Sequence, residues 1–114
     1  MISTSLEQSK KLLELGLDPN TADMKWFEQK LFEGYDGKIA KTYNENTKFE
    51  YLPAWSLDAL LRIIPYPYVL GKRKGTYYIS LVPIKYSIMG NDTPLDAAYY
   101  MITWLIENNY IEHK

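Results

Sequence analysis

The feature that most constrains the fold is a helix pattern over residues 94–107. Thr93 is a good N-cap, Pro94 suits the first helical position, and Asp96 puts a negative charge in the first turn. Such a wide apolar side must be covered by another element, so we expect this helix to be buried against a sheet. The apolar side carries Leu95, Ala98, Tyr99, Ile102, Leu105 and Ile106, and it is widened by Met101 and Trp104.

The sheet is predicted from residues 66–89, where apolar and polar side chains alternate. Tyr77, Ile79 and Leu81 fall on one face of an extended chain, and residues 71–75 (GKRKG) form the predicted turn with a glycine at each end. A third run of alternating apolar and polar residues, at the end of this range, completes the predicted sheet. We therefore predict an α+β fold, in which an antiparallel β-hairpin or three-stranded meander packs against the C-terminal helix.

Two shorter helices are predicted earlier in the chain. Residues 4–15 form the N-terminal helix, with Thr4 and Glu7 at the spacing of a capping box. Residues 56–64 form the central helix, with Ser56 as its N-cap. Both patterns end at a residue that cannot easily continue a helix, a glycine in the first case and a proline in the second.

The middle of the chain, residues 21–55, is the least regular part. Residues 24–32 fit either a short amphipathic helix or an extended segment. Residues 44–48 are predicted to form a loop, and residues 49–52 alternate like a short strand. The length is that of one domain, so we expect residues 1–114 to share one hydrophobic core.

Composition excludes several functional classes. The chain has no Cys and carries 13 Lys+Arg against 14 Asp+Glu, a net charge of −1. The lack of Cys excludes thiol catalysis, disulfides, iron–sulfur clusters and zinc sites built on thiolates. The basic excess typical of DNA-coating proteins is missing. We find no apolar run of about 20 residues and no signal-peptide pattern, so we expect a cytoplasmic protein without membrane contact.

Residues that could carry chemistry are few. His113 is the only histidine, so a catalytic triad or a histidine metal site would depend on the next-to-last residue. Asp18 begins a calcium-loop-like pattern, but Asp23 stands where that loop needs glycine. Asp92 and Asp96 are four residues apart, yet Asp96 already has a helix-capping role. We therefore predict that the protein is not an enzyme and uses no cofactor or metal.

The basic turn and the eleven tyrosines form the most unusual pattern. Tyrosines on a sheet beside a basic tip can stack nucleic-acid bases, and tyrosine is also a rigid anchor in protein interfaces. An ordinary structural explanation is favoured over both, because tyrosine suits half-buried strands and lysines in turns discourage aggregation. The candidate interaction surface consists of Lys72, Arg73, Lys74, Tyr66, Tyr68, Tyr78 and Lys85.

Three groups of residues resemble a protein family. They are residues 6–16 (LEQSKKLLELG) with 21–24 (TADM), then residues 53–61 (PAWSLDALL), then residues 94–98 (PLDAA) with 104–108 (WLIEN). In order and spacing they resemble small uncharacterised proteins of prophages and mobile elements of gut anaerobic bacteria. That family has no known activity, so no functional residue is carried over. The resemblance implies an intracellular accessory protein of phage-like origin.

These observations support three functional hypotheses. The leading one is a non-enzymatic, phage-derived accessory protein that acts through protein–protein interaction. The alternative is a nucleic-acid-binding accessory protein that uses the basic hairpin tip and its tyrosines. A hydrolase built on Asp and Glu with a borrowed metal ranks last, because no spacing demands it. A homodimer is also possible, since an exposed strand over residues 66–70 could pair with its copy.

Overall fold

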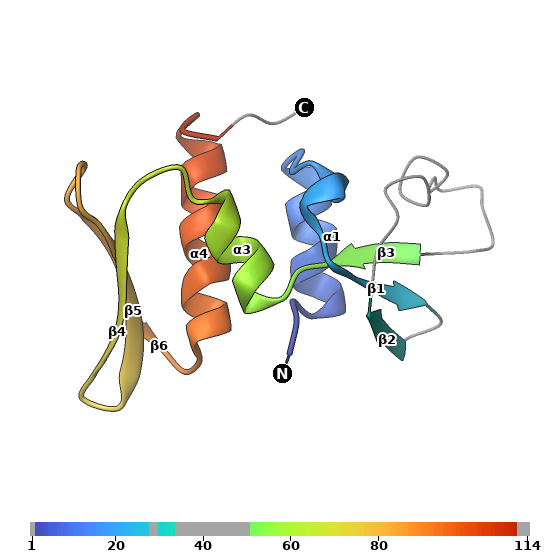
Figure 1. The fold of residues 1–114 in the computed structure, drawn as a ribbon, viewed down its shortest axis with the longest axis horizontal. Coiled ribbons are helices and arrows are strands. Elements are labelled where there is room, and N and C mark those ends of the chain that lie inside the picture. Colours follow the sequence, from blue (N-terminus) through green and yellow to red (C-terminus); the bar gives the residue numbers. More distant parts are fainter. Residues whose placement is uncertain (1, 28–29, 34–50, 112–114) are drawn as a thin grey trace.

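The fold is given by a computed structural model that describes residues 2–27, 30–33 and 51–111. Figure 1 shows two sheets at opposite ends of the molecule, with the three labelled helices between them. This is the predicted α+β class. The elements in chain order are α1 (Leu6–Glu14), the 3-10 turn η1 (Pro19–Thr21), β1 (Met24–Phe27), β2 (Lys30–Glu33), β3 (Tyr51–Ala54), α3 (Leu57–Ile63), β4 (Tyr68–Arg73), β5 (Thr76–Leu81), β6 (Tyr86–Asn91) and α4 (Pro94–Glu107).

The C-terminal helix α4 has the predicted bounds. The hydroxyl of Thr93 accepts a hydrogen bond from the backbone N–H of Asp96 at 3.0 Å, which caps the helix. The expected apolar stripe is buried, and Met101 is buried beside it, whereas Trp104 is only partly buried. The helix contacts β5 and β6 on one side and α3 on the other. Its wide apolar side is therefore explained, because α4 packs against both a sheet and a helix.

The second sheet is the predicted three-stranded meander, with the order β4-β5-β6 and antiparallel pairing throughout. Its turn is shorter than expected. The prediction of a turn over residues 71–75 was wrong in extent, since pairing continues to Arg73 opposite Thr76. Only Lys74 and Gly75 form the turn, and both have positive φ, 52° and 82°. Two consecutive residues of that conformation match the twist of a tight hairpin, so the strands can pair to their ends.

The first helix is capped one residue later than predicted. Ser5 is the N-cap, and it exchanges hydrogen bonds with Gln8 in a capping box, so the assignment to Thr4 and Glu7 was wrong. Thr4 is instead fully buried, and its hydroxyl bonds the hydroxyl of Ser9 at 2.8 Å. A buried hydroxyl needs partners, and the interior supplies them here.

The first sheet has the order β2-β1-β3. Residues 24–27 and 30–33 pair as antiparallel strands, so the extended alternative was correct for the described part of this segment. The last two residues of the predicted strand over residues 49–52 belong to β3, Tyr51–Ala54. Residues 49–50 and the predicted loop over residues 44–48 lie outside the described residues. The central helix α3 has Ser56 as N-cap, as predicted.

Buried side chains from α1, α3, β5 and α4 form one continuous hydrophobic cluster. Trp55 is a large, fully buried member of this cluster, and it lies between β3 and α3. In the part of the chain that the structure describes, no helix has the length and apolar character needed to cross a membrane.

Replacing Thr4 by Val tests the buried hydroxyl. The change keeps the branched shape but leaves the backbone N–H of Trp55 and the hydroxyl of Ser9 without this partner. We expect the free energy of unfolding to fall by about 2–3 kcal/mol, as for loss of buried hydrogen bonds. Urea unfolding measures it. Thr76→Val is the control, because that hydroxyl bonds an exposed turn carbonyl, and an equal loss in both variants would contradict the role of Thr4.

Candidate functional site

The second sheet has one face toward α4 and one face away from it. Strand pairing places Leu70, Ile79 and Ile88 together, and Ile79 is fully buried beneath α4. Because side chains alternate along a strand, the neighbouring residues lie on the opposite face. We call this the outer face. It carries Val69, Gly71 and Arg73 of β4, Thr76, Tyr78 and Ser80 of β5, and Ser87 and Met89 of β6.

Three of the predicted surface residues come together at one end of the outer face. Arg73, Lys74 and Tyr78 line a cavity of about 330 Å³. Its other walls are Thr76, Met89 and Gly90. Three residues of the predicted interaction surface, two basic residues and one tyrosine, thus line the same cavity.

The other four predicted residues lie elsewhere. Register places Tyr68 and Lys72 on the helix-facing side of β4, where the ammonium of Lys72 lies 5.3 Å from the ring centroid of Tyr77. Tyr66 packs on the core and meets the ring of Tyr110 edge-on at 6.0 Å. Lys85, with φ of 50°, lies in the turn between β5 and β6, at the opposite end of the meander from the basic turn.

Tyr78 is positioned by the glycine opposite it. A Cβ built on Gly71 would lie 2.5–2.7 Å from the hydroxyl and ring atoms of Tyr78, which is closer than atoms can approach. The ring of Tyr78 therefore lies directly on the backbone of β4, and only glycine leaves room for it. The sequence could have indicated this contact, because a glycine inside a strand is typical of a position that another group approaches closely.

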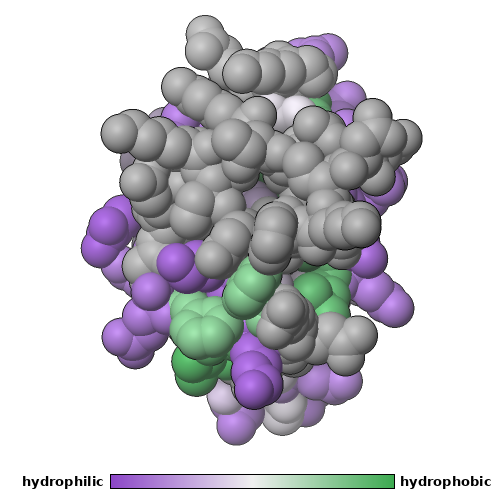
Figure 2. Space-filling model, turned by 90° about the vertical axis from the view of Figure 1, so that its right-hand side faces the viewer, coloured by the Kyte–Doolittle hydropathy of each residue, from purple (hydrophilic) through white to green (hydrophobic). Residues whose placement is uncertain are grey.

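The outer face has an apolar component. Val69 is 48% exposed and Met89 is 59% exposed, and both belong to this face. At the opposite end of the molecule, where the first sheet lies, the described part of the surface shows a few hydrophobic side chains between hydrophilic ones (Figure 2). Scattered apolar residues of that kind are ordinary on protein surfaces.

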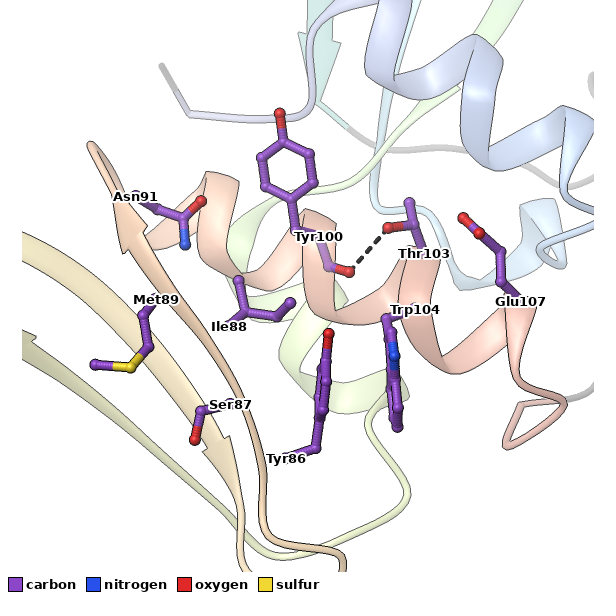
Figure 3. Close-up of a pocket in the computed structure, with 9 residues that line it drawn as sticks. All are labelled: Tyr86, Ser87, Ile88, Met89, Asn91, Tyr100, Thr103, Trp104 and Glu107. Carbon is purple, nitrogen blue, oxygen red and sulfur yellow. Dashed lines mark hydrogen bonds between the residues drawn. The ribbon is translucent and has the colours of Figure 1, made fainter.

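A second cavity, of about 380 Å³, lies between β6 and α4 (Figure 3). Sequence reasoning missed it. Gly90 has φ of 79° and lies in a β-bulge, so two residues of β6, Met89 and Gly90, stand opposite the single residue Tyr78. The bulge brings Asn91 opposite Tyr77, on the side of α4. A Gly-Asn pair at the end of an alternating strand is the signal that could have indicated this bulge.

Three of the described carboxylates have structural partners. Asp96 accepts a hydrogen bond from Gln8 of α1, Asp58 pairs with Arg62, and Asp18 caps the 3-10 turn through the N–H of Asn20. Within residues 2–27, 30–33 and 51–111, no three His, Cys, Asp or Glu side chains are grouped as metal ligands would be. His113 lies outside the described residues.

Among the titratable groups of the described residues, one has a clearly perturbed pKa. Burial, followed by the neighbouring Tyr100, Glu107 and Glu14, raises the pKa of the Tyr99 phenol above its ordinary value. Tyr99 lies on the buried side of α4, so its phenolate would lose hydration and would also be repelled by the two carboxylates.

Comparisons with protein-family models, with curated proteins and with solved structures gave no match for this chain.

Gly71→Ala tests the seat of Tyr78. The backbone tolerates alanine, because Gly71 is not among the residues with positive φ, but the new Cβ must displace the tyrosine ring. We expect a loss of about 1–3 kcal/mol in the free energy of unfolding. In a Tyr78→Ala background the same change should be neutral or stabilising. Equal effects in both backgrounds, measured by urea unfolding in a double-mutant cycle, would contradict the contact.

The raised pKa of Tyr99 predicts the direction of a pH effect on stability. The folded state holds the phenol proton more tightly than the unfolded state, so the contribution is fully present below the unfolded pKa of about 10 and is lost as the pH rises through the folded pKa. We expect Tyr99→Phe to lessen the fall of the unfolding free energy above about pH 10. Urea unfolding across this range measures it, and parallel curves for the two proteins would refute the assignment.

Proposed function

We propose that this chain is a non-enzymatic binding module that recognises an extended, acidic segment of another protein. The binding surface is the outer face of β4-β5-β6 with its basic end, Arg73 and Lys74. In line with the sequence resemblance, the proposed setting is a phage-derived accessory role in the cytoplasm. The observation that carries the proposal is the combination of exposed apolar residues and an anchored tyrosine on one sheet face, next to basic residues that have no acidic partner among the described residues.

The make-up of this surface supports a protein partner. Interface centres are enriched in aromatic residues, methionine and arginine, and depleted in lysine and aspartate. Tyr78, Met89 and Arg73 meet around the 330 Å³ cavity, and Tyr78 is held against Gly71 before any partner binds. An anchor that is already ordered loses little conformational freedom on binding.

Charge indicates what kind of segment fits. In the described part of the chain, neither Arg73 nor Lys74 forms an ion pair. Acidic residues of a partner would complement them, and this complementarity raises association rates and selects the partner. A second copy of this chain is a poorer complement at β4, because the strand sequence YVLGKR contains no acidic residue.

The edge of the sheet supports an extended partner segment. β4 is the edge strand of the order β4-β5-β6, so one side of its backbone has no strand partner among the described residues. A peptide can add to such an edge through main-chain hydrogen bonds, while side chains at alternate positions contact the sheet face. The exposed side chain of Val69 lies on this strand, beside the proposed path.

Nucleic-acid binding is the second candidate, supported by the contact of Arg73 and Lys74 with the same cavity as Tyr78. Stacking surfaces for single strands use several aromatic faces. Here register leaves Tyr78 as the only tyrosine on the outer face of the described strands, because Tyr68, Tyr77 and Tyr86 have the opposite orientation. This distribution favours the protein partner.

Site-specific crosslinking tests the location of the surface. A photoreactive phenylalanine analogue at Val69 is expected to capture a protein after nuclease treatment, whereas the same analogue at exposed Glu14 of α1 is not. The captured protein is then identified and purified. Equal capture at both positions would contradict the proposal, and so would capture of a second copy alone or of material that nuclease removes.

Charge reversal then tests the mode of binding with the purified partner. Arg73→Glu with Lys74→Glu should weaken binding at least about tenfold and reduce its salt dependence, because two attractive charges become repulsive. The matched control is Lys10→Glu with Lys11→Glu on the exposed side of α1, which changes the net charge equally. Equal weakening by both pairs would show that only the overall charge matters.

A further inference from the structure

The cavity between β6 and α4 contains a buried donor that the fold does not use. Asn91 is 9% exposed, and its amide nitrogen Nδ2 is buried without a hydrogen-bond partner in the structure. Among the buried side-chain nitrogen and oxygen atoms of the described residues, it is the only one without a partner. The side chain points from β6 toward α4 (Figure 3). Buried polar groups are nearly always satisfied, so an unused donor on a cavity wall suggests a ligand.

The surrounding structure does not explain this amide. Thr93 already caps α4, so Asn91 is not needed for that purpose. The bulge at Gly90 sets the direction of the side chain, and a leucine at the same position would fill the space without leaving a donor unpaired. The choice of asparagine is therefore costly to the fold unless an acceptor atom enters the cavity.

The charge of the cavity limits what can enter. Among the described residues that line it, Glu107 is the only charged one. Glu107 is in the last turn of α4, which contains no basic residue, and the negative end of the helix dipole lies there too. This end of the cavity attracts cations and disfavours anions, so a neutral carbonyl oxygen suits Asn91 better than a carboxylate does.

The wall between these two polar ends is flat and partly apolar. Tyr86 stacks on Trp104 with ring centroids 3.7 Å apart and an interplanar angle of 9°. Both rings and Ile88 line the cavity between Asn91 and Glu107 (Figure 3). The part of α4 that borders it runs from Tyr100 to Glu107, about 10 Å of helix at 1.5 Å per residue. That length suits a single ring with a substituent at each end.

We infer that this cavity binds a small, flat organic cation that carries a carbonyl oxygen. Asn91 Nδ2 donates a hydrogen bond to the carbonyl, the ring lies along Tyr86, and the ammonium group lies near Glu107. The inference does not rest on the proposed protein-binding role, because Asn91, Tyr86 and Glu107 do not border the cavity at the basic turn, although Met89 borders both cavities.

The probe is 4-(aminomethyl)benzamide, which has a carboxamide and an ammonium group at opposite ends of one ring. Its binding is measured by NMR titration of the full chain, following the side-chain NH₂ of Asn91 and the indole N–H of Trp104. We expect a dissociation constant of about 1–5 mM, ordinary for a molecule of this size. Two related probes test the two ends of the molecule separately. In 4-(aminomethyl)benzoate an anion replaces the neutral carboxamide, and benzamide lacks the cationic group. Both should bind more weakly.

Three variants test the named contacts. Asn91→Leu should weaken binding of the probe about 3- to 10-fold, the usual range for one hydrogen bond, while raising the melting temperature of the free protein. Asn91→Asp keeps the shape, removes the donor and provides a second test if the leucine variant fails to fold. Glu107→Gln should weaken binding of the cationic probe and leave the affinity for benzamide unchanged. Glu33→Gln on β2 is the control for loss of a carboxylate elsewhere in the chain.

Several results would overturn the inference. One is the absence of any shift at the Asn91 amide up to about 20 mM probe, well above the expected dissociation constant. Another is equal binding of the carboxamide and carboxylate probes. A third is a fall in stability for Asn91→Leu with unchanged probe affinity, which would make Asn91 a packing residue.

Discussion

The fold depends on a reciprocal contact between Thr4 and Trp55, which are 51 residues apart. The N–H of Thr4 donates to the carbonyl of Trp55 at 2.8 Å, and the N–H of Trp55 donates to the Thr4 hydroxyl at 3.1 Å. The indole of Trp26 donates to the Thr4 carbonyl at 2.9 Å. One buried residue thus joins the start of α1 to β1 and to the junction of β3 and α3. With that junction fixed, Trp55 fills the core on which α4 rests.

The same core leaves the second sheet unequally covered. The inner face of β5 is buried through Ile79 and Leu81, whereas β4 has an uncovered edge and β6 reaches α4 along its side. A three-stranded sheet covered on one face by one long helix is stable without a second layer. It can therefore present its outer face to solvent. The two cavities lie where this arrangement leaves space, at the basic turn and along the β6–α4 boundary.

Local signals explain which parts of this fold could be predicted. Thr93, Pro94 and Asp96 define the start of α4 within four residues, and Ser56 does the same for α3. The cap of α1 could not be assigned so simply, because Thr4 and Ser5 are adjacent and the choice depends on distant Trp55. For a similar reason, the structure brings only Arg73, Lys74 and Tyr78 of the candidate surface together at one cavity. Strand parity separates Tyr68 from Tyr78, and the second turn carries Lys85 to the other end of the sheet, so neither position follows from composition.

The bulge at Gly90 influences both cavities, because it sets the directions of the side chains before and after it. Met89, before the bulge, borders both cavities, while Asn91, after it, borders only the one at α4. A regular strand would put residues 89 and 91 on the same face, because side chains alternate with period two. The extra residue instead turns Asn91 toward α4 and leaves Met89 exposed on the outer face. Substitution of Met89 would therefore alter both sites together, whereas Asn91 and Arg73 each belong to a single cavity and can separate small-molecule binding from partner binding.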